Sequence, residues 1–248
     1  MKVKNMMYGK LCAEFYDLDK QYASTEETAF YRQIFTNRDL ILEPMCGSGR
    51  LLIPLMRGGY QIHGMDNSRS MLDNCEKRAL EYGLRPVLIE SSIEDMAVER
   101  RYSGIVIPVG SFQLIYPRAS AESALDKFRD MLLPGGKLVL DLFVPWEALC
   151  EHAQVESYER SVAAHDGTTI TVRSVNTAHK YEQYYINENT YTKHVNDKLI
   201  AQENEIMRVN WYYQYEAAYM LEKHGFKNLI YRERVINGSN HMTFVAGK

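Results

Sequence analysis

Apolar and polar positions along the first 145 residues alternate between two periods. Apolar residues at helical spacing predict helices at 50–56, 67–79 and 121–133. Short apolar runs predict strands at 41–43, 60–66, 86–89, 105–107 and 137–143. Strands that alternate with helices in this way form parallel sheets, so we expect an α/β fold.

After residue 211 the pattern predicts one more helix and a hairpin. Residues 213–224 have helical spacing and are followed by Gly225, a residue typical of helix ends. Two further strands are expected at 227–235 and 241–246, joined through 237–240. We therefore expect a doubly wound, mostly parallel seven-stranded sheet of the Rossmann-like type, with one antiparallel strand.

The stretch 145–210 is too long for an ordinary connection and has strand signals instead. Period-two alternation at 168–175 and a tyrosine-rich run at 181–193 predict an antiparallel β insertion. The resulting division is an N-terminal lid or helical segment at 1–40, an α/β core at 41–144 and 211–248, and an insertion at 145–210. We expect the insertion to serve the substrate and oligomer contacts.

The first predicted strand ends in Glu43 and is followed by two glycines, Gly47 and Gly49. Glycines at such a turn permit positive φ angles and let a ligand approach the backbone N–H groups. A dinucleotide fingerprint would place a third glycine where this chain has Leu52, which disfavours NAD. Glu43 would repel a phosphate and would suit a positively charged ligand group.

A second acidic residue, Asp66, ends the next predicted strand nineteen residues after Gly47. A carboxylate at this place can accept hydrogen bonds from both hydroxyls of a ribose. It is followed by Asn67-Ser68, which is typical of a helix start. The sequence therefore predicts an adenosyl ligand, with Asp66 and Asn67 beside its ribose.

Together these residues resemble motif I of the class I S-adenosylmethionine-dependent methyltransferases. Glu43, Gly47 and Gly49 stand on matching positions, and Met45 stands where the family often has its first glycine. The resemblance implies S-adenosylmethionine as the cofactor. It also implies further cofactor contacts, which we expect near the adenine from Ser92 and Ile93, with Asp95 as an alternative, and near the transferable methyl from Val109, Gly110 and Ser111.

The N-terminal run Phe15-Tyr16-Asp17 resembles the entry segment of small-molecule methyltransferases. In those enzymes a tyrosine contacts the methionine part of the cofactor. The resemblance implies this role for Tyr16, with Tyr22 and Arg32 as further candidates. The alternative is a surface helix whose aromatic residues pack on the core. The insertion resembles that of the sugar N-methyltransferases and, more distantly, of glycine N-methyltransferase, in which an antiparallel layer roofs the active site.

The expected chemistry is an in-line displacement at the methyl carbon, transferring it to a nitrogen or oxygen of a small molecule. An amine acceptor need only be neutral, whereas a hydroxyl would benefit from a general base. Candidate catalytic residues are Asp141, His152 and Tyr116, and no spacing commits any of them.

Charge and composition narrow the partners. A net charge of −3 without a dense basic block disfavours a nucleic-acid substrate. No apolar run is long enough for a membrane span, the start of the chain lacks a signal-peptide core, and the cysteines lack metal-ligand spacing. We expect a cytoplasmic monomer or homodimer without a metal. Two alternatives stay open: an RNA-modifying methyltransferase and a regulatory protein that binds S-adenosylmethionine without catalysis.

Overall fold

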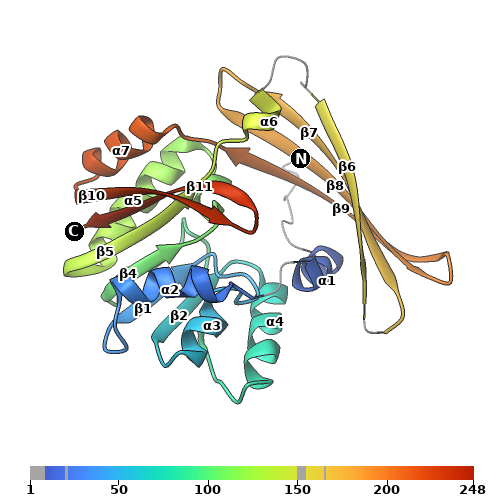
Figure 1. Ribbon diagram of the computed structural model, residues 1–248, viewed down its shortest axis with the longest axis horizontal. Helices are drawn as coiled ribbons and strands as arrows, with labels where there is room; N and C mark the ends of the chain where they lie inside the picture. Colours follow the sequence, from blue (N-terminus) through green and yellow to red (C-terminus); the bar gives the residue numbers. More distant parts are fainter. Residues whose placement is uncertain (1–8, 20–21, 150–154, 165) are drawn as a thin grey trace. The chain divides into compact units, whose positions relative to one another are not determined.

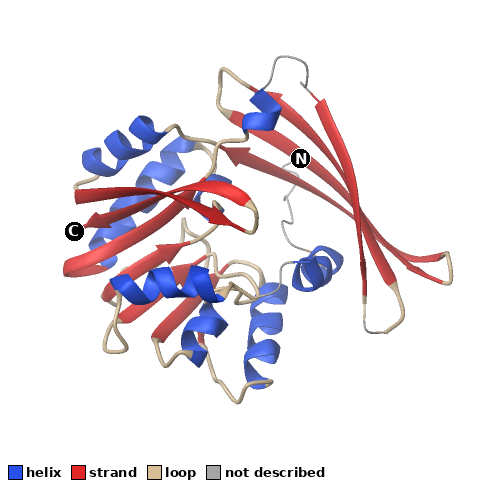
Figure 2. Ribbon diagram, viewed as in Figure 1, coloured by secondary structure: helices blue, strands red, loops and turns tan. Residues whose placement is uncertain are grey.

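The computed structural model describes residues 9–19, 22–149, 155–164 and 166–248, and the chain divides into two compact units (Figure 1). The α/β unit comprises Tyr22–Val144 and Trp211–Lys248. The antiparallel unit comprises Met1–Gln21 and Pro145–Asn210. Helices and strands alternate in the α/β unit, whereas long strands dominate the antiparallel unit (Figure 2).

The α/β unit contains a seven-stranded sheet in the order β10-β11-β5-β4-β1-β2-β3. Its strands are β1 (Leu40–Pro44), β2 (Gln61–Asp66), β3 (Val87–Glu90), β4 (Tyr102–Ile107), β5 (Leu132–Leu142), β10 (Lys227–Ile236) and β11 (Ser239–Gly247). Neighbouring strands are parallel except in the two pairs that β11 makes, with β5 and with β10. The predicted mostly parallel sheet with one antiparallel strand is confirmed.

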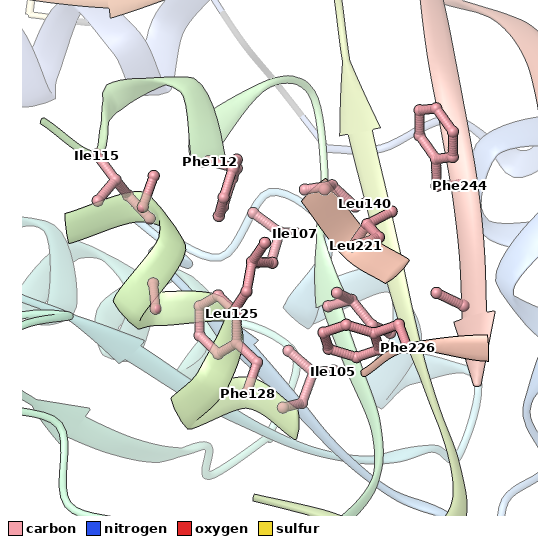
Figure 3. Close-up of a cluster of buried hydrophobic side chains, with 14 of the residues drawn as sticks. Ile105, Ile107, Phe112, Ile115, Leu125, Phe128, Leu140, Leu221, Phe226 and Phe244 are labelled. Atoms are coloured by element: carbon pink, nitrogen blue, oxygen red, sulfur yellow. The ribbon is translucent and has the colours of Figure 1, made fainter. Parts of the chain in front are cut away.

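Helices cover both faces of this sheet. The side chains of β4 alternate between the faces, with Ile105 and Ile107 in one buried cluster and Val106 in the other. Figure 3 shows the first cluster, in which Leu125 and Phe128 lie close to these isoleucines. That face is covered by α5 (Arg118–Met131) and α7 (Gln214–Lys223), and the opposite face by α2 (Thr25–Ile34), α3 (Leu52–Arg57) and α4 (Arg69–Leu80).

The start of α4 and the turn of the terminal hairpin are each determined by one or two residues. Ser68 caps α4 because its hydroxyl accepts a hydrogen bond from the N–H of Met71 at 3.3 Å. The terminal hairpin turns at Asn237 and Gly238 alone, both with positive φ, so the turn is shorter than the predicted 237–240. Asn-Gly is the pair that a two-residue hairpin turn prefers, which lets both strands extend further.

The antiparallel unit is a four-stranded sheet in sequence order with two helices. It consists of β6 (Val155–Ala163), β7 (Thr169–His179), β8 (Tyr184–Val195), β9 (Lys198–Asn210), α1 (Lys10–Asp19) and the short α6 (Trp146–Leu149). All three strand pairs are antiparallel, as predicted. One face of the sheet carries buried polar side chains joined by hydrogen bonds, namely Ser174, Asn187, Asn189 and Glu205.

The two helices near the N-terminus belong to different units, α1 to the antiparallel unit and α2 to the α/β unit. Phe15 and Leu11 of α1 pack with Ile170 and Tyr191 of the antiparallel sheet. The N–H groups of Leu11 and Cys12 donate to the Glu203 carboxylate, each at 3.1 Å, which fixes the start of α1 on β9. In α2, by contrast, the apolar side chains face the core of the α/β unit. None of the described helices is long and apolar enough to span a membrane.

Candidate functional site

The glycine turn after β1 lies beside the end of β2 and is held there by Asp66. The N–H of Gly47 donates to Oδ2 of Asp66 at 2.8 Å, and the N–H of Ser68 donates to Oδ1 at 2.9 Å. Asp66 is 9% exposed, and this burial raises its pKa although the backbone N–H groups of Ser68, Gly47 and Asn67 oppose the shift. The structure therefore brings Gly47, Asp66 and Asn67 together at the carboxyl edge of the sheet.

The two glycines of the turn, Gly47 and Gly49, have different surroundings. Gly49 has a φ of 83°, and a Cβ there would lie 2.6 Å from Sγ of Cys75, so this glycine lets the turn pack on α4. Gly47 has a φ of 53°, and a Cβ there would meet nothing within 4 Å. The space beside its Cα, where a side chain would lie, is therefore open.

Met45 has the backbone of a glycine without being one. Its φ is 60°, in the left-handed region that favours glycine. Its side chain is half-buried and packs against the core cluster under α5. The residue that departs from the family motif thus keeps the backbone conformation that a glycine would adopt there.

Glu43 is a buried carboxyl group at the same edge. It is 2% exposed, and its Oε2 has no hydrogen-bond partner among the described residues. Burial raises its pKa to about 8, Glu27 and Asp66 add to the rise, and Arg50 opposes it. Arg50 is already engaged, because it donates to both carboxylate oxygens of Glu27, at 2.8 and 2.5 Å. One oxygen of Glu43 is therefore without a partner among the described residues, and burial favours the neutral form of the carboxyl group.

In the segment after β3, the predicted adenine contacts Ser92 and Ile93 have different surroundings. Ser92 is half-buried, and its hydroxyl accepts from the N–H of Asp95 at 3.0 Å and donates to the Asp95 carboxylate at 2.9 Å. Both predicted alternatives, Ser92 and Asp95, are thus joined in one turn. The side chain of Ile93 instead lies in the core, and its carbonyl accepts from Nζ of Lys127 at 3.2 Å.

The loop after β4 lies against the end of β5. Val109 and Gly110 have φ angles of 52° and 76°, and Ser111 begins a short 3-10 helix, η1 (Ser111–Leu114). The N–H of Val109 donates to Oδ2 of Asp141 at 3.3 Å. Asp141 has no exposed surface and also accepts from Tyr31, Arg234 and Thr243. A carboxylate enclosed by four donors does not suit the general base that the sequence suggested.

The remaining candidates lie in different places. The ring of Tyr22 stacks with the guanidinium of Arg78, which donates to Oγ of Ser48 at 2.8 Å, so Tyr22 lies beside the glycine turn. Arg32 is close to Gly58, just before the start of β2 and at the opposite edge of the sheet. Arg32 and Tyr22 both line a groove of about 360 Å³ beside α2 and α3. Arg32 is far from the turn because α2 runs away from that edge.

Three further candidates are placed as follows. Tyr116 is 53% exposed and precedes α5. Tyr16 is part of α1 in the antiparallel unit, so its contact with the cofactor stays a prediction. His152 lies outside the described residues.

Sequence reasoning missed the side chains that support the site from a distance. The Arg50–Glu27 ion pair and the Tyr31 contact with Asp141 join α2 to the carboxyl edge across 23 and 110 positions. The only sequence feature that pointed to one of these contacts was the position of Arg50 directly after the glycines. Among the described residues, no group of three or more His, Cys, Asp or Glu side chains could hold a metal ion.

The comparisons with known proteins agree with this geometry. Residues 41–136 match a family model described as a methyltransferase domain. The chain is 30% identical over 105 residues to a ribosomal protein L11 methyltransferase of Thermus thermophilus, covering 41% of this chain and 37% of that protein. It is 25% identical over 146 residues to a dTDP-3-amino-3,6-dideoxy-alpha-D-glucopyranose N,N-dimethyltransferase of Streptomyces fradiae, covering 56% of this chain and 54% of that protein.

A solved structure extends the likeness to nearly the whole chain. The S-adenosylmethionine-bound amino pentose methyltransferase from Micromonospora echinaspora superposes with a TM-score of 0.70 at 16% identity, covering 98% of each chain. The chain spans about a third to a half of the length of the two curated relatives. Residues 41–136 thus match a methyltransferase domain, and the chain shares the Rossmann-like fold of the solved amino pentose methyltransferase.

Proposed function

We propose that this protein transfers a methyl group from S-adenosylmethionine to an amine of a small molecule, with an amino sugar as the favoured acceptor class. The observation that carries the proposal is the turn at Gly47. The space where a side chain would lie is open at Gly47 and its N–H is held by Asp66, at the edge where open α/β sheets bind nucleotides.

The residues present fit this cofactor. The two carboxylate oxygens of Asp66 have about four lone-pair sites, and the backbone N–H groups of Gly47, Ser68 and Asn67 bind to them, so capacity remains for a ribose hydroxyl. Glu43 offers a buried carboxyl oxygen without a partner, which suits the positive charge of the methionine part. When bound, S-adenosylmethionine supplies a methyl group on a positively charged sulfur.

The protein's part in the reaction is binding and alignment. The amine must arrive neutral, with its lone pair in line with the carbon–sulfur bond. In such a transfer the carbon–sulfur bond would break as the carbon–nitrogen bond forms, and the amine would release its proton to water. Asp141, the carboxylate that the sequence suggested as a base, is buried and accepts from four donors, which does not suit that role. An amine requires no such base, whereas a hydroxyl would benefit from one.

The acceptor class rests on the relatives and on the antiparallel unit. The Streptomyces fradiae relative and the amino pentose methyltransferase are named for amino sugars. The buried amides of Asn187 and Asn189 lie in one hydrogen-bonded row with Glu205. Amides and a carboxylate are the groups that bind hydroxyls and amines, so we assign acceptor recognition to residues 145–210.

Binding and transfer can be tested in sequence. Titration calorimetry with S-adenosylhomocysteine should show binding, and methyl transfer should be measured on amine-bearing sugar nucleotides, their hydroxyl counterparts and structured RNA. Transfer to the amino sugars supports the proposal. Binding without transfer to any of the three would favour a regulatory protein, and transfer to RNA would contradict the assigned acceptor class.

The replacement Asp66→Ala should weaken S-adenosylhomocysteine binding by about tenfold or more, since hydrogen bonds to a charged group contribute about 1.5–3 kcal/mol. The matched control is Asp73→Ala, which removes an exposed carboxylate of α4 and should leave binding unchanged. A 2′-deoxy analogue separates a ribose contact from a general loosening of the turn. Wild-type protein should bind this analogue more weakly, and Asp66→Ala should not distinguish it from the parent ligand.

A further inference from the structure

The loop between β4 and η1 adopts a conformation that its sequence does not favour. Val109 is β-branched, and its φ of 52° lies in the left-handed region, where such a side chain is strained. Gly110 follows with a φ of 76° and carries no such strain. A strained residue persists only where its surroundings hold it, so a restraining group is required.

The end of β5 provides that restraint at both residues. The N–H of Val109 donates to Oδ2 of Asp141 at 3.3 Å, and the N–H of Gly110 donates to the Asp141 carbonyl at 3.1 Å. Both consecutive backbone donors of the turn therefore bind one residue. Because a Cβ on Gly110 would lie 2.6 Å from the Phe143 ring, the turn is also pressed against this strand.

The two oxygens of Asp141 have separate tasks. Oδ1 accepts from Thr243 at 2.6 Å and from Arg234 at 3.4 Å, both on the terminal hairpin. Oδ2 accepts from the hydroxyl of Tyr31 at 3.3 Å and from Val109. The hairpin thus fixes the carboxylate, and its other oxygen reaches the turn.

Gln113 extends the same attachment downstream. It is fully buried, its Nε2 donates to the Phe143 carbonyl at 3.0 Å, and its Oε1 accepts from the Phe143 N–H at 2.8 Å. The loop after β4 is therefore held at its start by Asp141 of β5 and at its end by the bonds of Gln113 to Phe143, the residue directly after β5.

We propose that Asp141 is a positioning residue, which holds the strained Val109–Gly110 turn in the conformation that methyl transfer requires. This inference rests on the proposed function. Strand β4 is parallel to β1 and lies beside it, so the Val109–Gly110 turn lies at the same edge of the sheet as Gly47. Asp141 itself need not touch substrate or cofactor. It acts through the backbone of Val109 and Gly110.

The test is a double-mutant cycle of Asp141→Asn with Val109→Gly. Asparagine has the same size but lacks one acceptor oxygen, so Asp141→Asn should lower kcat about tenfold in the otherwise unchanged protein. In the Val109→Gly background the turn is no longer strained, so the same replacement should lower kcat by less than about twofold. Equal losses in both backgrounds would overturn the proposal, as would a displaced pH profile that marks Asp141 as a base.

Hydrogen exchange gives a readout that needs no activity. The amides of Val109 and Gly110 should exchange about tenfold faster in Asp141→Asn. The control Asp73→Asn makes the same replacement at an exposed carboxylate of α4 and should leave exchange at the turn within about threefold of the parent. Unchanged exchange in Asp141→Asn would refute the positioning role, whereas failure to bind S-adenosylhomocysteine in the unsubstituted protein would refute the proposed function instead.

Discussion

Replacing Arg50 by methionine should lower the free energy of unfolding by about 3–5 kcal/mol, because it leaves the buried Glu27 carboxylate without its partner. The two side chains are 6% and 5% exposed, and the pair is bidentate. Urea unfolding followed by circular dichroism measures the loss. Burial is decisive here, since an exposed ion pair would contribute only about 0–1 kcal/mol.

The control for Arg50→Met is the double replacement Glu27→Gln with Arg50→Met. Removing both charges also removes the uncompensated one, so the double variant should be more stable than Arg50→Met alone. If the double variant is no more stable than the single one, then the loss does not come from an unpaired carboxylate. A surface control is available in Arg69→Met, whose ion pair with Asp73 is exposed and should contribute little.

The core of the α/β unit could be predicted because its signals are local. Strand and helix periods locate β1, β2, β4 and α4 within a few residues, since each depends on which side chains face the core. The motif spacing also paired Gly47 with Asp66, because a βαβ unit brings successive strand ends to one edge. For these elements, neighbouring residues contain the necessary information.

The supporting contacts could not be predicted, because each depends on tertiary packing. Asp141 was proposed as a base only because of its position in a predicted strand. The fold shows that Tyr31 and Thr243 donate hydrogen bonds to it and enclose it. Arg32 and Tyr22 were both assigned to the cofactor, but only the fold shows that Tyr22 contacts Arg78 beside the glycine turn, whereas Arg32 lies close to Gly58. The packing of α1 on the antiparallel sheet likewise depends on residues 150 or more positions away.

The second large effect concerns pH and Glu43. The pKa of this carboxyl is raised by burial from 4.5 to about 8 in the folded protein, so the folded state holds a proton that the unfolded state releases. The contribution of Glu43 to the free energy of unfolding is fully present below pH 4.5. It is lost as the pH rises toward 8, by about 1.4 kcal/mol for each pH unit in between. Glu43→Gln cannot titrate and should lack this slope.

The measurement is the free energy of unfolding of wild-type protein and Glu43→Gln from pH 5.5 to pH 7.5. The difference between the two should change by about 2–3 kcal/mol over this range, with the wild type losing stability relative to the variant. A ligand cation beside Glu43 favours its ionised form, so S-adenosylmethionine binding should release protons in the same window and tighten as the pH rises. Parallel stability curves for the two proteins would show that Glu43 is already ionised without ligand, and its pairing with a cation would then contribute no pH dependence.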